Sequence, residues 1–186
     1  MAADFSMFTG GDRMDVLEAI KGRRSVREFK PDPVKDEDLQ KILDAGRSAP
    51  SAGNCQPLEL VVVKDPSIKR RLATAALEQT FIAEAPVVIV VCANVPRTSW
   101  RYGRRGKELY CIQDTAAATQ NMLLAAYSLG YGTCWIGAFD DDAVAEVIRA
   151  PIGVRPVAII PLGKPAEKPS PSSRRPLSEI VHNNGF

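Results

Sequence analysis

Hydrophobic and polar positions repeat along the chain with helical spacing in some stretches and with strand spacing in others. Asp15, followed three residues later by Glu18, has the form of a capping box and predicts a short helix that ends near Gly22. The acidic run 36–38 predicts the start of a second helix that ends before Pro50. One face of that helix is apolar or small: Leu39, Ile42, Leu43 and Gly46.

Short runs of β-branched residues follow. Residues 58–63 and 86–93 are predicted to be strands that are buried on both faces, and a helix over about 66–83 separates them. The polar stretch 94–107 contains two glycines and several arginines, so we expect a long loop or a short mobile helix that could act as a lid.

The second half of the chain continues the alternation of helices and strands. The alanine-rich segment 111–129 gives the strongest helix pattern, and we expect this helix at the centre of the molecule. A strand is predicted over 133–139 and a helix over 140–149. The last strand is predicted over 156–162, near a sheet edge because Pro161 interrupts it.

These elements predict one layered α+β domain with an α/β/α arrangement. A chain of 186 residues with 45% hydrophobic content can bury one adequate core. We expect residues 14–186 to form this single domain and residues 1–13 to be a flexible N-terminal extension. Residues 164–186 are expected to form an extended C-terminal arm, because they contain Pro165, Pro169, Pro171 and Pro176.

Composition excludes several classes of function. The net charge is only +2, from 24 basic and 22 acidic residues, so no global charge favours nucleic acid or an anionic membrane. Neither a zinc site nor a disulfide framework is indicated, because the chain has no CxxC pair and a single histidine, His182; we expect its four cysteines to be reduced thiols. No run of about 18 apolar residues occurs, which predicts a soluble, cytoplasmic protein.

A basic cluster follows the first predicted helix: Arg23, Arg24, Ser25, Val26 and Arg27. If this segment is extended, Arg23, Ser25 and Arg27 point to one side. Two guanidinium groups and a hydroxyl on one side match the acceptor oxygens of a phosphate. Two alternatives stay open at this point. The arginines could simply interact with the helix C-terminus, or they could form a nucleic-acid patch, although the cluster lacks stacking aromatics.

A second motif follows the second predicted helix, with the sequence Ala-Pro-Ser-Ala-Gly-Asn-Cys-Gln-Pro over 49–57. Together with Arg-Arg-Ser-x-Arg at 23–27, it resembles the signature of the FMN-dependent nitroreductase family. Two later stretches are similar to that family as well: Leu-Gly-Tyr-Gly-Thr-Cys-Trp-Ile-Gly over 129–137, and Leu-Gly-Lys-Pro over 162–165 followed by Arg-Arg-Pro over 174–176.

The resemblance implies a fold and an assembly. The expected fold has a central mixed, largely antiparallel sheet that helices flank. Two chains would form an intertwined homodimer, with each FMN at the subunit interface and with C-terminal segments that wrap the partner.

The resemblance also implies the site residues. Arg23 and Ser25 would face the FMN phosphate together with Arg174, and Arg27 would lie nearer the pyrimidine edge and N1. The other subunit would present the loop that contains Pro50, Ser51 and Asn54 to the flavin ring. The complete set of expected cofactor-binding residues is Arg23, Arg24, Ser25, Arg27, Pro50, Ser51, Ala52, Asn54, Gln56, Trp135, Ile136, Gly137 and Arg174.

The expected activity is a ping-pong cycle of a flavoprotein oxidoreductase. NADH or NADPH would deliver hydride to flavin N5, and a nitroaromatic, a quinone or a related small-molecule acceptor would then be reduced. The chemistry needs no catalytic side chain and no metal. Trp100 and Tyr102 could stack on an aromatic acceptor, or 94–107 could be a merely solvated loop. Three alternatives remain: specialised flavin chemistry on the same fold (dehalogenation, flavin fragmentation, azoline oxidation), flavin storage or sensing without turnover, and nucleic-acid binding.

Overall fold

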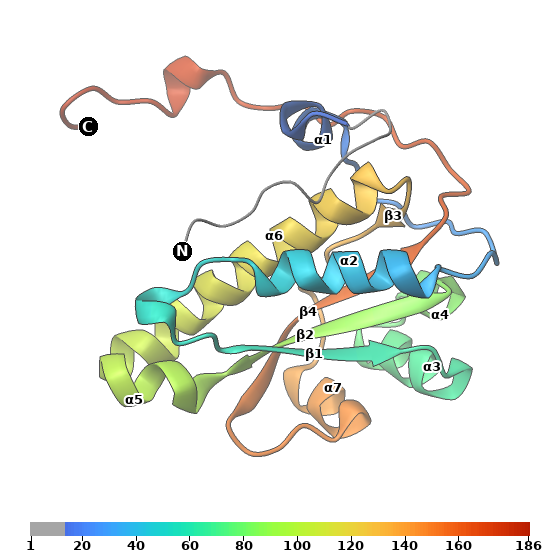
Figure 1. Cartoon of the computed structure of the whole chain (residues 1–186), viewed down its shortest axis with the longest axis horizontal. Coiled ribbons are helices and arrows are strands. Elements are labelled where there is room, and N and C mark those ends of the chain that lie inside the picture. The colour runs from blue at the N-terminus through green and yellow to red at the C-terminus, as the bar shows by residue number, and fades with distance from the viewer. Residues whose placement is uncertain (1–13) are drawn as a thin grey trace.

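A four-stranded antiparallel sheet forms the centre of the molecule in the computed structural model, which describes residues 14–186 (Figure 1). The expected extension over 1–13 lies outside the described residues. The strand order is β1-β2-β4-β3, and the strands are β1 (Leu58–Val63), β2 (Val87–Asn94), β3 (Gly132–Thr133) and β4 (Val154–Gly163). The four strands pair antiparallel throughout, and the parallel component of the predicted sheet is limited to an isolated bridge between Ser25 and Thr133, outside these strands.

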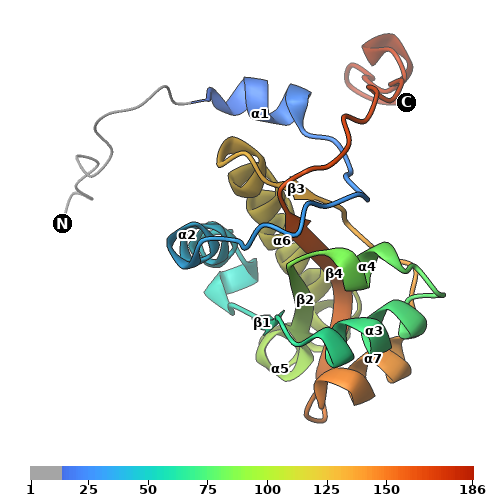
Figure 2. The ribbon, with the colours of Figure 1, turned by 90° about the vertical axis from the view of Figure 1, so that its right-hand side faces the viewer.

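Helices cover both faces of this sheet (Figures 1 and 2). They are α1 (Val16–Gly22), α2 (Asp36–Arg47), α3 (Pro66–Ala75), α4 (Phe81–Glu84), α5 (Val95–Arg105), α6 (Cys111–Ser128) and α7 (Asp141–Ile148). Three short turns of helix complete the set: η1 (Ala52–Asn54), η2 (Gly106–Tyr110) and η3 (Leu177–Glu179). The predicted capping box of α1 is present, since the Asp15 side chain accepts from the Leu17 N–H and the Glu18 side chain accepts from the Asp15 N–H.

The core consists of two layers that β2 separates. Val88, Val90 and Cys92 pack with α3, α4 and α7 on one face, and the intervening apolar residues of β2 pack with α2 and α6 on the other. This alternation follows from the period of two along a strand, and it buries β2 almost completely. The predicted α/β/α arrangement is confirmed.

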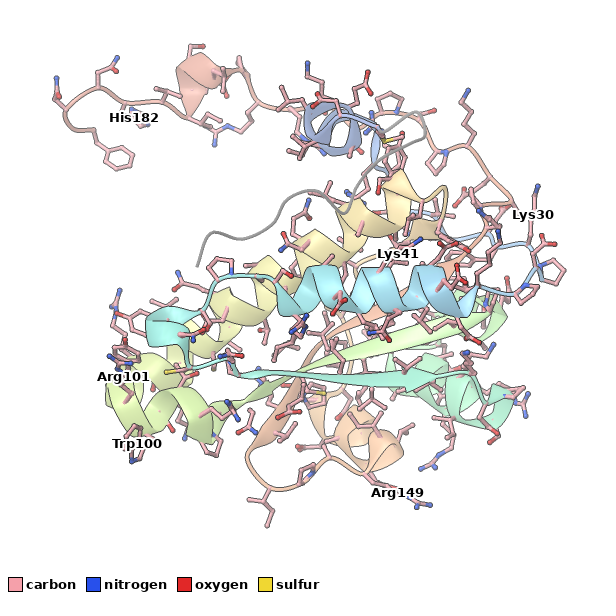
Figure 3. All side chains as sticks on the ribbon, in the orientation of Figure 1. Lys30, Lys41, Trp100, Arg101, Arg149 and His182 are labelled. Atoms are coloured by element: carbon pink, nitrogen blue, oxygen red, sulfur yellow. The ribbon has the colours of Figure 1, made fainter. Side chains whose placement is uncertain are left out.

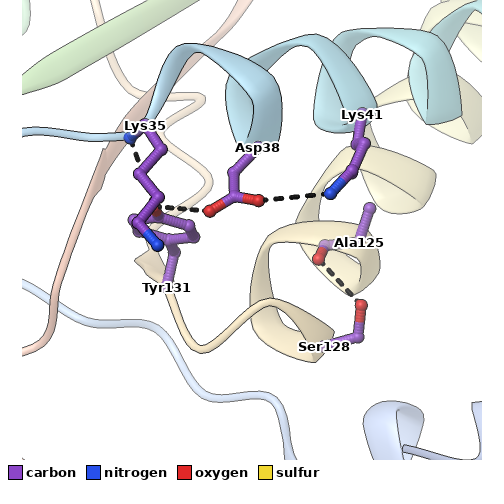
Figure 4. Close-up of polar contacts among 6 residues, drawn as sticks. All are labelled: Lys35, Asp38, Lys41, Ala125, Ser128 and Tyr131. Atoms are coloured by element: carbon purple, nitrogen blue, oxygen red, sulfur yellow. Dashed lines mark hydrogen bonds and ion pairs between the residues drawn. The ribbon is translucent and has the colours of Figure 1, made fainter. Parts of the chain in front are cut away.

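Tyr131 fixes the turn that follows α6 against the start of α2 (Figure 4). Its hydroxyl donates to Asp38 Oδ2 over 2.9 Å and accepts from the Lys35 N–H over 3.3 Å, and the Lys164 ammonium lies 4.0 Å from the centre of its ring. These contacts hold the chain that leads into β3 in place. As a result, Thr133 is positioned to pair with Ser25.

The prediction for the two edges of the sheet was wrong. β1 is not buried on both faces, because it is an edge strand and Val62 remains 37% exposed. β4, by contrast, is internal despite Pro161, since it lies between β2 and β3. The N–H and C=O groups of Ile159 both bond to Ile136, on the side of β4 that faces β3. Two residues later, the nitrogen of Pro161 points to the same side. The chain after Thr133 has left the sheet at that point, so β4 tolerates a proline there.

Two segments also differ from their predicted form. The helix predicted over 66–83 stops at Ala75, because Leu77 and Glu78 are left-handed, and α4 follows separately. The strand predicted over 133–139 is reduced to the two residues of β3 and an isolated bridge at Ile136. Of the two forms expected for 94–107, a long loop or a short mobile helix, the structure has the helix, and its expected mobility and role as a lid stay predictions.

The chain after β4 returns to the segment that follows α1. Lys30 N–H donates to Lys164 O and Ala166 N–H donates to Glu28 O, each over 2.8 Å. From Ser170 onward every residue is exposed, and the chain runs past α1 and away from the body (Figure 1). Within residues 14–186, no helix combines the length and apolar character that a membrane crossing needs.

Candidate functional site

Five of the predicted cofactor residues line one cavity of about 240 Å³: Arg23, Arg24, Ser25, Arg27 and Arg174. We call it the arginine cavity. The sequence separates Arg174 from the others by almost the whole chain, and the return of the C-terminal segment past residues 28–30 brings it back. Val26, between Ser25 and Arg27, points the other way and is buried against Gly132. Side chains that alternate in this way are what an extended backbone predicts.

The arginine cavity carries uncompensated positive charge. None of its four guanidinium groups forms an ion pair with a carboxylate of residues 14–186. The pKa of Arg23 is lowered, first by burial and further by the nearby guanidinium groups of Arg24 and Arg174. Such crowding favours binding of an anion with several acceptor oxygens, and a phosphate is such an anion.

Arg24 has a second role besides lining the cavity. Its Nη1 donates to Lys21 O over 2.6 Å and to Arg23 O over 2.8 Å, so this guanidinium caps the C-terminus of α1. The helix-terminus interpretation of the arginines therefore holds for Arg24. Since the cluster follows a helix C-terminus, side chains and not a helix dipole supply its attraction for anions.

The segment 134–137 follows Thr133, which pairs with Ser25, and its first residue, Cys134, lies near Arg27 and Arg23 of the arginine cavity. Burial raises the pKa of the Cys134 thiol, while the neighbouring Arg27 guanidinium acts in the opposite direction. Ile136 is buried, and its backbone N–H and C=O both bond to Ile159, so this residue has no backbone group left for a ligand. Gly137 is exposed with open space beside it, and Trp135 is 39% exposed.

A second cavity, of about 270 Å³, lies beside the 49–57 motif, and we call it the loop cavity. The predicted residues Pro50, Ser51 and Gln56 line it. The loop is internally bonded, since the Ser51 hydroxyl accepts from the Gln56 N–H over 3.0 Å. Two residues that the sequence interpretation did not single out also line this cavity, Arg97 from α5 and Asp114 from α6.

The loop backbone adopts an uncommon conformation. Gly53, Asn54 and Gln56 have φ angles of 53°, 56° and 50°, in the left-handed region that non-glycine residues rarely occupy. Contacts from α5 hold this shape: Arg97 Nε donates to Cys55 O over 3.0 Å and Arg101 Nη1 donates to Gly53 O over 2.9 Å. Ala52 and Asn54 thus belong to a loop that later elements of the chain fix.

Asp114 holds the same loop from the other side. Its Oδ1 accepts from the Ala52 N–H over 3.0 Å, and its Oδ2 is fully buried without a hydrogen-bond partner among residues 14–186. Burial raises the pKa of this carboxyl, and the bond from Ala52 acts against that rise. A sequence signal existed, since Asp114 is the only charged residue of α6 and lies at helical spacing from the buried Cys111 and Ala118.

The two residues expected to bind substrate differ in position. The Tyr102 ring packs edge-on against Tyr110 with 5.2 Å between ring centres, and its hydroxyl lies over Gly53. Trp100 is 88% exposed, projects away from the body and lines neither cavity (Figure 3). A role for either residue in acceptor binding stays a prediction.

In one chain the arginine cavity and the loop cavity are separate. They share no lining residue. Asp114 and Tyr127, which lies beside Arg23, are about 20 Å apart along the axis of α6 at ~1.5 Å per residue. The labelled Lys30 and Arg101 mark the same two ends of the molecule in Figure 3.

Among models of known protein families, the one described as "Nitroreductase family" matches this chain over residues 20–83 and 75–164. A protein named NADH dehydrogenase from Thermus thermophilus is 34% identical, over 90% of this chain and 95% of its own. Oxygen-insensitive NADPH nitroreductase from Salmonella typhimurium is 31% identical, over 91% and 74%.

The fold agrees with these sequence matches. The solved structure of NADPH:FMN oxidoreductase from Vibrio harveyi, complexed with NAD+, superposes with a TM-score of 0.84 at 29% identity, over 92% of this chain and 77% of that one. The family predicted from the motifs is therefore confirmed, and the chain belongs to the nitroreductase family.

Proposed function

We propose that this protein is an FMN-dependent NAD(P)H oxidoreductase that reduces nitroaromatics, quinones or related acceptors. The observation that carries the proposal is the arginine cavity, with four guanidinium groups and one hydroxyl around about 240 Å³. The relatives support it, since their names include an NADPH nitroreductase and an NADPH:FMN oxidoreductase.

The donors of the arginine cavity fit the phosphate of FMN. Guanidinium groups donate paired hydrogen bonds to phosphate oxygens, and none of these arginines has an ion-paired carboxylate within residues 14–186. Arg174 Nη1 donates to Ser172 O over 3.3 Å and to Ser173 O over 2.9 Å, so this guanidinium would offer its other N–H groups to a phosphate. When bound, the flavin carries hydride equivalents from NAD(P)H to the acceptor. Arg27, beside the segment 134–137, places positive charge where it would stabilise a reduced, anionic ring.

A homodimer would unite the two cavities. The loop 50–56 of one chain would meet the flavin ring, while the arginine cavity of the other chain holds the phosphate. Surface composition supports this assembly, because α1 exposes Val16, Leu17 and Ile20 by 60%, 59% and 54%. The arm over 164–186 exposes Leu177, Ile180 and Val181 as well, and we propose that it wraps the partner.

The proposal is tested with purified protein. We expect a yellow protein, or a colourless one that takes up FMN with quenching of flavin fluorescence. Anaerobic addition of NADH or NADPH should bleach the flavin, and a nitroaromatic or quinone should restore its colour. A protein that cannot be reconstituted with FMN would contradict the proposed cofactor. Bleaching by neither nucleotide would instead point to flavin storage or sensing.

A further inference from the structure

Asp114 is a partly buried acidic side chain that no motif of the sequence includes. Its Oδ1 accepts the Ala52 N–H, and its Oδ2 is buried without a partner while the residue lines the loop cavity. An unpartnered buried polar atom in a folded protein calls for a physical account. We propose that Asp114 is a positioning residue: a protonation-dependent clasp that sets the position of the ring-facing loop 50–56.

The conformation of the loop is the first argument for a clasp. Asn54 and Gln56 are left-handed without being glycine, and such conformations persist only when the surroundings determine them. The loop has anchors from two other elements. Arg97 and Arg101 of α5 hold the carbonyl groups of Cys55 and Gly53, whereas Asp114 of α6 holds the amide of Ala52 at the opposite end.

The surroundings of Oδ2 are the second argument. Three charged groups line the loop cavity together with Asp114, and one titratable group lies near it on α6: Arg47, Glu59 and Arg97, and Cys111. Each of the three charged groups is occupied elsewhere. Arg47 pairs with Asp44, Glu59 accepts from Asn94, and Arg97 donates to Cys55 O.

Protonation of Asp114 is thereby coupled to the loop. An ionised carboxylate with one bare, buried oxygen is unfavourable, and it becomes favourable only if a donor moves toward Oδ2. A candidate donor is the hydroxyl of Ser51, the residue before Ala52, which accepts from the Gln56 N–H but donates to no acceptor among residues 14–186. With the loop as it stands, the neutral carboxyl costs less than the ionised one, because it buries an unpaired O–H and not an unpaired charge, so ionisation favours a shifted loop. Burial, which raises the pKa of Asp114, moves this transition toward neutral pH.

The first test measures the loop without any cofactor. Amide hydrogen exchange of the segment 49–57 is compared in the wild type, Asp114→Asn, Asp114→Ala and the matched surface control Asp142→Asn. Asn keeps an acceptor for the Ala52 N–H and Ala removes it. We expect Asp114→Ala to lower protection of Ala52 on the order of tenfold, with protection largely retained in Asp114→Asn and in the control. Unchanged protection in Asp114→Ala would overturn the clasp.

The second test rests on the proposed function and measures FMN affinity between about pH 4.5 and pH 8. The ratio of wild-type affinity to Asp114→Asn affinity is followed, because ionisation of the FMN phosphate cancels in this ratio. We expect the ratio to fall several-fold as pH rises, since the ionised wild type alone loses the binding-competent loop. The same ratio for Asp142→Asn should be flat.

The two failures can be told apart. A flat ratio for Asp114→Asn, with tight FMN binding, overturns the protonation-dependent clasp and leaves the proposed function intact. If no variant binds FMN, the proposed function fails, and the exchange at Ala52 measured at both ends of the same pH range decides the clasp alone.

Discussion

The arginine cavity and the loop cavity are both built from motif residues, yet they are stabilised in opposite ways. The arginine cavity gathers four like charges, from Arg23 to Arg174 along the chain, that have no ion-paired carboxylate among the described residues. The loop cavity is fixed by hydrogen bonds from Arg97, Arg101 and Asp114, and its backbone is held in left-handed conformations. A bound anion would neutralise the charges of the arginine cavity, whereas the hydrogen bonds of the loop cavity fix its shape without a ligand.

This difference leads us to expect different responses to mutation. Changes in the arginine cavity should alter cofactor affinity and leave folding stability nearly unchanged, or raise it, because like charges are removed. Changes in the loop should cost stability first, and affinity only through shape. Uniting the two cavities requires a second chain, so disrupting the interface should affect both together.

The largest effect is expected from the exposed apolar face of α1. Leu17→Gln with Ile20→Gln should convert a dimer into a monomer and abolish FMN binding, because the two cavities would no longer meet. Glutamine is chosen because it adds no charge near the arginine cavity. Light scattering and flavin titration measure the two outcomes, with Ile152→Gln, at a fully exposed apolar position outside α1, as control. A wild type that is monomeric while binding FMN tightly would refute the shared site.

The next largest effect should come from the arginine cavity itself. Arg23→Ala with Arg174→Ala should weaken FMN binding on the order of 10²–10⁴-fold, from about 1.5–3 kcal/mol per charge-assisted contact. The control Arg70→Ala removes an exposed arginine that lines neither cavity.

Riboflavin separates the phosphate contribution from the ring contribution. It should bind the wild type much more weakly than FMN does, whereas the double variant should bind both flavins with similar affinity. If the double variant still prefers FMN as strongly as the wild type does, these arginines do not contact the phosphate.

An intermediate effect is expected in the loop, at Gly53. A Cβ atom there would lie 2.3 Å from the Tyr102 hydroxyl oxygen, and φ is already positive. Gly130→Ala is the matched control, since Gly130 is also left-handed but a Cβ would meet only Lys164 Nζ at 3.6 Å. Denaturant unfolding should give a loss of roughly 2–4 kcal/mol for Gly53→Ala and about 1 kcal/mol for Gly130→Ala. Equal losses of unfolding free energy in the two variants would show that the packing of α5 against the loop does not restrict position 53.

Sequence patterns anticipated the parts of this molecule that depend on local chemistry. The capping box of α1, the apolar face of α2 and the buried β2 follow from spacing alone. The motifs also indicated which residues would gather, as the return of Arg174 to Arg23 shows. The halt of α3 at Ala75 and the short β3 were not predictable, because left-handed residues and departures from the sheet depend on tertiary contacts.

The candidate site divides in the same way. Pro50, Ser51 and Gln56 were found by motif, but the side chains that hold them come from elements without a motif. Glu167 is a similar case: its carboxylate accepts from the Arg27 and Glu28 N–H groups, and only the return of the C-terminal segment brings it there. Long-range hydrogen bonds of this kind leave no periodic pattern in a sequence.

The smallest effect is expected in the pH dependence of stability, and it isolates Asp114 from every other loop contact. Its pKa is raised in the folded protein, so the folded state binds a proton more tightly than the unfolded chain. The corresponding stability is fully present below the unfolded pKa, near 4, and is lost as pH rises through the folded pKa. Asp114→Asn removes this loss.

The free energy of unfolding of Asp114→Asn, relative to the wild type, should therefore increase with pH over that window and level off above it. Urea titrations at a series of pH values measure it, with Asp142→Asn expected to show no such trend. A difference that is constant with pH would mean that the loop keeps its position whether Asp114 is neutral or ionised. The contacts from Arg97 and Arg101 of α5 would then be enough to fix the loop at every pH.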